Sequence, residues 1–123
     1  MQIKNIIIAA AAATGVSAGC FSGGEPWGPQ SARDAAYGAV ADLCNHGALS
    51  GGFGAYQVKT ACANLPGNKR ANFQVKWERG TNQGLAASDC ILRLNNEIGG
   101  CAYGGSTTTA DWTFTSDPNA GRC

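Results

Sequence analysis

The first half of the chain contains one stretch with apolar residues at helical spacing. Ala32, Ala36 and Val40 recur every fourth residue within SARDAAYGAVADLC, residues 31–44, a pattern typical of an amphipathic helix. Gly47 follows its end and suits the left-handed conformation that often closes a helix. Because the apolar face is mostly alanine, we expect this helix to lie close to its neighbour.

A second helix is predicted for residues 88–98. Ser88 is a suitable N-cap, Asp89 is favourable in the first turn, and Gly99 ends the pattern. The apolar stripe consists of Ile91, Leu94 and Ile98.

Three stretches alternate in the way that β-strands do, at residues 56–62, 73–78 and 112–115. The first two flank the turn-forming sequence NLPGNK, residues 64–69, so we expect them to form an antiparallel hairpin. The glycine-rich residues 47–54, 80–84 and 99–111 are predicted to be turns and loops.

The order helix, strand, strand, helix, strand shows no parallel βαβ repeat. We therefore predict an α+β fold, in which a small antiparallel β-sheet carries two helices packed on one face.

Residues 1–18 have the layout of a secretory signal peptide. A positively charged start, MQIKN, precedes the apolar run IIIAAAAATGV, and Val16-Ser17-Ala18 offers small residues before a cut at Gly19. We therefore expect one secreted, extracellular domain, residues 19–123. The alternatives are a buried apolar helix and a lipoprotein signal ending at Cys20, which would leave an odd number of thiols. No run approaches the length of a membrane-spanning helix.

The charge of the mature part argues against two classes of partner. Without Lys4 it carries eight Lys and Arg and eight Asp and Glu, so the formal charge falls from +1 to zero. No block of like charges is present. Nucleic acid and anionic membrane surfaces are therefore not expected as partners.

Six cysteines in a short secreted chain predict three disulfides. They are Cys20, Cys44, Cys62, Cys90, Cys101 and Cys123. No two of them lie within ten residues of each other, which argues against a metal site. Fifteen pairings are possible. A Cys90–Cys101 bridge is disfavoured, because the helix after Cys90 rises about 12 Å.

The sequence predicts no catalytic residue, metal site or cofactor. His46 is the only histidine, and its place at a predicted helix end suggests a capping role. The cysteines are expected to be oxidised, which leaves no thiol nucleophile. The remaining enzymatic hypothesis is a glycosidase that uses a pair of loop carboxylates, and nothing in the sequence supports it.

Two aromatic residues in glycine-rich loops suggest a carbohydrate site. Trp27 lies in GGEPWGP beside Glu25, and Tyr103 lies in GCAYGGS. A ring exposed in such a loop suits the apolar face of a sugar, while nearby polar groups bond its hydroxyls. The candidate ligand-binding residues are Trp27, Glu25, Tyr103 and Asp111. The competing interpretation is that Trp27 and Tyr103 pack on the core, as we expect for Trp77 and Trp112.

The C-terminal third, DCILRLNNEIGGCAYGGSTTTADWTFTSDPNAGRC, resembles a class of small secreted fungal proteins. CFSGGEPWG and FQVKW fit the same class, and within it the chain is similar to the Y3-type glycan-binding proteins of mushrooms. The resemblance implies a compact, non-enzymatic, lectin-like α+β module whose partner is a cell-surface or cell-wall glycan. The matching residues look structural: Cys90, Leu94, Glu97, Ile98, Cys101, Trp112, Asp117, Pro118, Asn119, Gly121 and Cys123.

A weaker similarity to small KP4-type killer toxins keeps a second hypothesis open. In it the protein is a secreted effector or toxin that acts on a host or competitor cell, through a surface protein of that cell.

The ending SDPNAGRC has two interpretations. Asp117, Asn119 and Gly121 alternate as in a calcium loop, but the chain ends before the Glu that an EF-hand needs at its twelfth position. The alternative is a turn beginning at Asp117-Pro118, with Cys123 tying the C-terminus to the domain. We favour this second interpretation.

Overall fold

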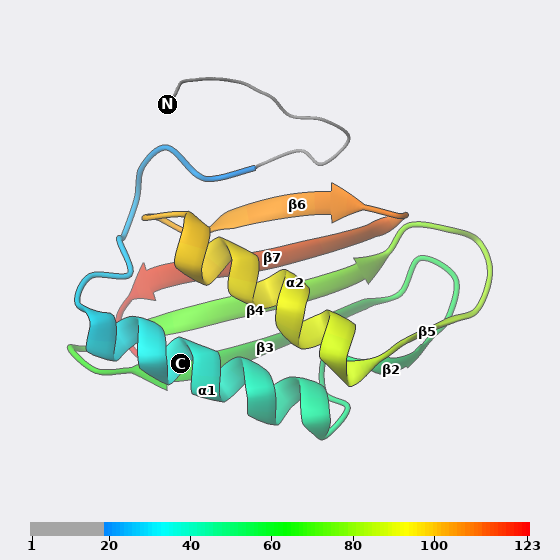
Figure 1. Ribbon diagram of the computed structural model, residues 1–123, viewed down its shortest axis with the longest axis horizontal. Helices are drawn as coiled ribbons and strands as arrows, with labels where there is room; N and C mark the ends of the chain where they lie inside the picture. Colours follow the sequence, from blue (N-terminus) through cyan, green and yellow to red (C-terminus); the bar gives the residue numbers. More distant parts are fainter. Residues whose placement is uncertain (1–18) are drawn as a thin grey trace, which may run out of the picture.

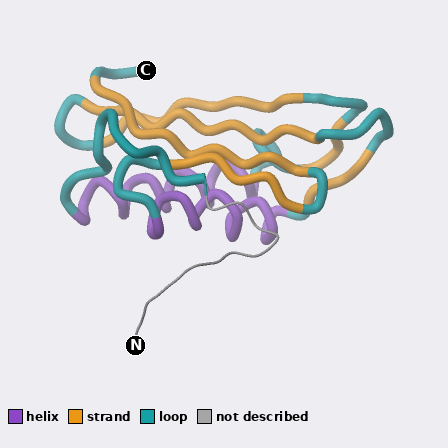
Figure 2. Tube along the Cα trace, turned by 90° about the horizontal axis from the view of Figure 1, so that it is seen from above, coloured by secondary structure: helices purple, strands orange, loops and turns teal. Residues whose placement is uncertain are grey.

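A computed structural model describes residues 19–123 and shows two layers (Figures 1 and 2). Helices α1 (Gln30–Asn45) and α2 (Ala87–Gly100) cover one face of an antiparallel sheet. The α+β prediction with both helices on one face is therefore confirmed. The predicted signal peptide, residues 1–18, lies outside the described residues.

The main sheet has four strands in the order β3, β4, β7, β6, and every pair is antiparallel. Strands β3 (Val58–Leu65) and β4 (Lys69–Trp77) form the predicted hairpin. Strand β7 (Trp112–Ala120) lies beside β4 and is longer than predicted. Strand β6 (Gly105–Thr109) was predicted to be loop. Its sequence, GSTTT, has no apolar alternation, because Gly105 is the only one of its five residues that is buried.

A second, two-stranded sheet pairs β2 (Gly51–Phe53) with β5 (Gln83–Leu85). Both segments were predicted to be turns because of their glycines. Only Phe53 and Leu85 bring apolar side chains to this sheet, and both are buried. Two anchors in six residues are too few to produce a readable pattern.

The alternation in β3 marks a strand, but its apolar members face outward. Val58 is 43% exposed, and Tyr56, just before the strand, is 60% exposed. Ala61, Ala63 and Leu65 face the helices instead. Period-2 alternation defines two faces of a strand without deciding which of them is covered.

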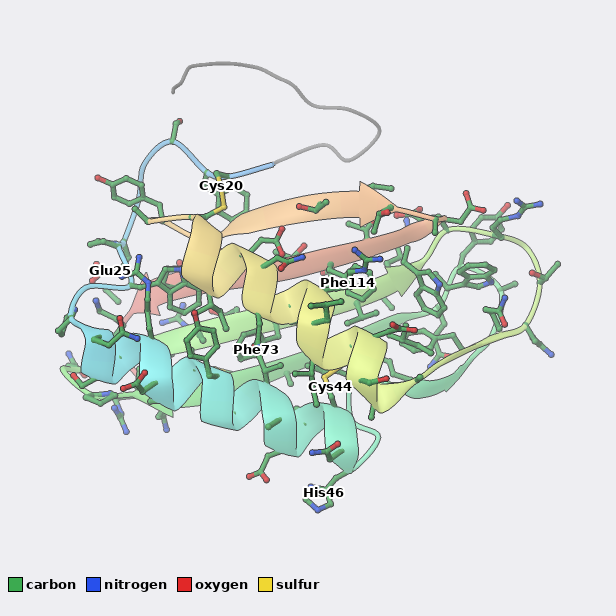
Figure 3. All side chains as sticks on the ribbon, viewed as in Figure 1. Cys20, Glu25, Cys44, His46, Phe73 and Phe114 are labelled. Carbon is green, nitrogen blue, oxygen red and sulfur yellow. A yellow bond between two sulfur atoms is a disulfide. The ribbon has the colours of Figure 1, made fainter. Side chains whose placement is uncertain are left out.

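The core lies between the helices and the inner faces of β4 and β7. Phe73 and Phe114, labelled in Figure 3, are buried in this core. Trp77 and Trp112 belong to this core, as predicted, with ring centroids 4.7 Å apart. The helices contribute Ala36, Val40, Leu94 and Ile98.

The helix ends agree with the sequence only in part. Helix α1 ends at Asn45 with His46 as its C-cap, and Gly47 follows with φ +81°, as predicted. Ser88 does not cap α2, because the N-cap is Ala86 and no side chain bonds there. Asp89 lies in the first turn, and the helix continues through Gly99 to Gly100.

Three disulfides join distant parts of the chain, as predicted. Cys44–Cys90 links the two helices at their buried faces, Cys20–Cys101 holds the N-terminal segment, and Cys62–Cys123 holds the C-terminus. Cys90 and Cys101 have separate partners, as helix geometry requires.

The predicted turn at Asp117-Pro118 is wrong, because β7 continues through both residues to Ala120. Pro118 pairs with Ala71 on one side and lies beyond Ser116, the last residue paired with β6. No strand there requires the N–H that proline lacks. The chain turns at Gly121, with φ +86°, and the tail is tied down as expected.

We expect the bridge between the helices, Cys44–Cys90, and the bridge that holds the C-terminus, Cys62–Cys123, to differ in their effect on stability. Replacing both Cys62 and Cys123 by alanine should lower the free energy of unfolding by about 2–4 kcal/mol, because the unfolded chain gains conformational freedom when the bridge is lost. Replacing both Cys44 and Cys90 should lower it further, because these residues are also 1% and 0% exposed. Urea denaturation of the two double variants measures both values. Equal losses would show that packing around Cys44–Cys90 adds nothing.

Candidate functional site

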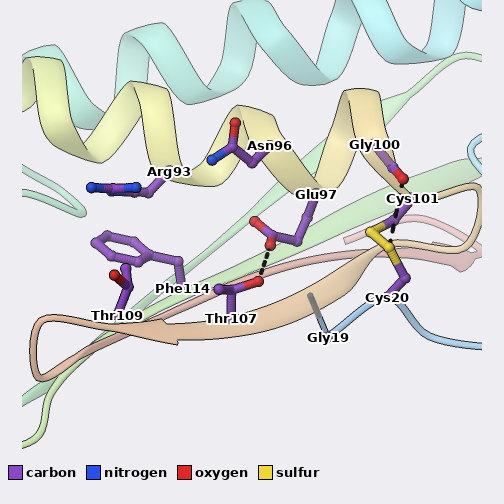
Figure 4. Close-up of a pocket in the computed structure, with 10 residues that line it drawn as sticks. All are labelled: Gly19, Cys20, Arg93, Asn96, Glu97, Gly100, Cys101, Thr107, Thr109 and Phe114. Carbon is purple, nitrogen blue, oxygen red and sulfur yellow. Dashed lines mark hydrogen bonds between the residues drawn. A yellow bond between two sulfur atoms is a disulfide. The ribbon is translucent and has the colours of Figure 1, made fainter. Parts of the chain in front are cut away.

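A pocket of about 200 Å³ lies between α2 and the β6–β7 hairpin (Figure 4). Helix α2 contributes residues at positions i, i+3, i+4 and i+7, which share one face of a helix. These are Arg93, Asn96, Glu97 and Gly100. The strands contribute Thr107, Thr109 and Phe114, and the first described residues, Gly19 and Cys20, close one end.

Glu97 is the unusual residue of this pocket, because it is a carboxylate that is only 4% exposed. The Thr107 hydroxyl donates a hydrogen bond to Oε1. The other oxygen, Oε2, is buried and has no hydrogen-bond partner among the described residues. An unpaired buried acceptor is costly and calls for a physical explanation.

The burial of Glu97 raises the pKa of its carboxyl above the ordinary value. The hydrogen bond from Thr107 and the positive charge of Arg93 oppose this shift but do not cancel it. The group therefore holds its proton to a higher pH than a solvated glutamate does.

Sequence reasoning treated Glu97 as a structural residue and missed its position in the pocket. A signal for it was present, since Glu97 follows Leu94 by three residues and directly precedes Ile98. It therefore interrupts the apolar stripe of α2 with a carboxylate, and acidic residues are rarely buried without a partner.

Trp27 is a core residue, so the prediction of an exposed indole is wrong. It is 0% exposed, and its Nε1–H donates to the carbonyl of Glu97 over 3.3 Å. Its backbone N–H donates to the carbonyl of Ala102 over 3.0 Å. The indole thus supports the end of α2 from below and presents no face to a ligand.

Glu25 and Tyr103 lie outside the pocket. Glu25 forms an ion pair with Lys69 (3.3 Å), whose Nζ also donates to the carbonyls of Pro26 (2.7 Å) and Trp27 (2.9 Å). These bonds hold the N-terminal loop on the sheet. Tyr103 is half-buried in the turn between α2 and β6.

Asp111 does not converge with the other predicted residues. It lies in the β6–β7 turn, at the end of the sheet opposite Glu25 (Figures 1 and 3). It is exposed, has φ +67° and accepts a hydrogen bond from Arg79 over 3.0 Å. The four predicted residues therefore do not form one site.

In residues 19–123, no group of three or more histidine, cysteine or acidic side chains could hold a metal ion. Within the same residues, neither helix is long and apolar enough to cross a membrane.

Comparison with known proteins identified a family for most of the chain. The family model described as Glycan binding domain Y3 matches residues 35–123, which include α2, the pocket strands and five of the six cysteines. It describes a glycan-binding family and not an enzyme family. No curated protein matched the chain.

Changing Trp27 to alanine should destabilise the domain rather than remove a ligand contact. We expect the free energy of unfolding to fall by about 3–5 kcal/mol, because a fully buried indole and its hydrogen bond are lost. Chemical denaturation checks this value. A variant as stable as the wild type would mean that the ring is not in the core.

Changing Glu97 to glutamine should alter how stability depends on pH. Since folding raises the pKa of Glu97, the unfolded chain ionises first as pH rises, and the wild type loses stability until the folded-state pKa is passed. The glutamine variant lacks this loss. The difference in melting temperature, variant minus wild type, should therefore grow with pH from about 4.5 and then level off.

The control for this experiment is Glu78→Gln. Glu78 also accepts a threonine hydroxyl, from Thr113 at 2.6 Å, but it lies on the outer face beside Lys76. A pH dependence that changes equally in both variants would contradict a special role of burial at Glu97.

Proposed function

We propose that this chain, which belongs to the glycan binding domain Y3 family, binds carbohydrate in the pocket between α2 and the β6–β7 hairpin. The proposal adds a location and a set of residues to a family whose members bind glycans. It also makes the protein a lectin-like module without a catalytic role.

The observation that carries the proposal is the unpaired Oε2 of Glu97 in a pocket. A sugar hydroxyl is a hydrogen-bond donor that can pair with such an acceptor without bringing a charge. Binding would satisfy an acceptor that folding leaves unpaired. Hydrogen bonds to charged groups contribute more than neutral ones, about 1.5–3 kcal/mol each.

The other pocket residues suit the rest of a sugar ring. Arg93 and Asn96 supply N–H donors beside Glu97, and Thr109 supplies a hydroxyl. Phe114, which is 2% exposed, gives the pocket an apolar base. A concave, mainly apolar surface with a few converging polar groups is the usual form of a small-ligand site.

We further propose that the protein acts outside the cell. The layout of residues 1–18 supports secretion, and three disulfides persist best in an oxidising compartment. An extracellular glycan-binding module would meet cell-surface and cell-wall carbohydrates.

The test is a glycan array probed with the wild type and with Glu97→Gln. Glutamine keeps the size of the side chain and an oxygen for Thr107, but it removes the negative acceptor. We expect affinity for the bound glycan to fall about tenfold or more, as the loss of one charged hydrogen bond implies.

The matched control is again Glu78→Gln, which should bind like the wild type. Equal binding by all three proteins would show that the glycan binds outside this pocket, and the proposed function would still stand. A wild type that binds no glycan at high protein concentration would refute the function itself.

A further inference from the structure

A second depression shares part of its lining with the pocket around Glu97. This depression has a volume of about 160 Å³ and lies toward the start of α2 and the β6–β7 turn. Three residues line both spaces: Arg93, Thr109 and Phe114. The residues that line the second space alone are Leu85, Asp89, Ala110 and Trp112. We call the two spaces together the α2 groove.

The α2 groove is longer than one sugar ring. It follows α2 from Asp89 to Gly100. At 1.5 Å per residue, these two positions are about 16 Å apart along the helix axis. The shared residues lie between the two depressions, so a ligand that passes Arg93 meets polar groups on both sides.

We infer that the α2 groove binds a linear oligosaccharide of uncharged sugars, with consecutive residues in the two depressions. This inference rests on the proposed glycan-binding function and specifies its ligand. Glu97 accepts a hydroxyl in the first depression and Asp89 accepts one in the second. The Arg93 guanidinium donates to the sugars on either side of it, because its several N–H groups point in different directions.

The charges along the groove favour a neutral ligand. Asp89, Arg93 and Glu97 are four residues apart on one face of α2, so a single cation stands between two carboxyl groups. A uronic acid, sialic acid or sulfated sugar would place its negative charge near one of those carboxylates. Like charges at such distances repel, and the one arginine is already flanked by two acids.

The second depression also offers apolar surface. Trp112 is 8% exposed and Leu85 is 6% exposed, and both line its floor. The C–H faces of a pyranose ring pack on such a surface, while its equatorial hydroxyls reach Asp89 and Thr109. The first depression is built the same way, with Phe114 below and Glu97 at the side.

The experiment measures affinity against chain length. The probes are fragments of one to five residues from cellulose, mannan, galactan and chitin, with oligogalacturonides as an acidic series, all on one array. Calorimetry then follows the series that the wild type binds best. We expect affinity to rise at least about tenfold between one and three residues and the neutral series to bind better than the acidic one.

The variant Asp89→Asn separates the two depressions. It should weaken binding of the longer fragments several-fold and weaken binding of the monosaccharide less. Asp42→Asn is the control, because Asp42 is another exposed helical aspartate and lies on α1. Equal affinity for one and for three residues, or tightest binding to the acidic series, would overturn the inference and leave glycan binding standing. Absence of binding to every series would refute both.

Discussion

The carbonyl groups at the C-terminal end of α2 are the points on which the arrangement of the site depends. The last four carbonyls of a helix have no partner within it. Two of them are bound by side chains from elsewhere: Trp27 donates to Glu97 over 3.3 Å, and Arg33 donates to Ile98 over 3.0 Å. Ser116 on β7 donates to the Leu94 carbonyl over 2.8 Å. The N-terminal segment, α1 and the sheet thus all fix the same turns of α2.

These three donors determine where the Glu97 carboxyl lies. The turn of the helix that carries Glu97 is held from three directions, and the Cys44–Cys90 bridge fixes the other end of α2 against α1. The Glu97 side chain is therefore held in one position, beside Thr107 of β6. A groove lined by a packed helix and a paired strand is more rigid than one built from loops, so little ordering is left for binding.

The sequence was most informative where one face of an element is buried and the other is wet. The alternation of Phe73, Val75 and Trp77 predicted β4, and the spacing of Leu94 and Ile98 predicted α2, because burial imposes a period. The sequence was misleading where burial imposes no such period on the side chains. In Gly105–Thr109 and in the two short strands of the second sheet, backbone pairing alone makes the strand, and no side-chain pattern records it.

The candidate site was harder to predict for a different reason. Aromatic residues in glycine-rich loops suggested an exposed platform, yet Trp27 fills the space under the end of α2, which only the folded chain reveals. Glu97 was in plain view, but its carboxyl belongs to a pocket whose other wall comes from strands that follow it in the chain. The sequence shows that a glutamate interrupts the apolar stripe of α2, but only the tertiary structure shows that this glutamate lines a pocket.

The three disulfides are not equally open to attack. Cys62 and Cys123 are both exposed, whereas Cys44 and Cys90 are sealed between the helices. Thiol–disulfide exchange requires the attacking thiolate to reach a sulfur atom. A mild reductant would therefore open the Cys62–Cys123 bridge and release the C-terminal tail while the Cys44–Cys90 bridge still joins the two helices.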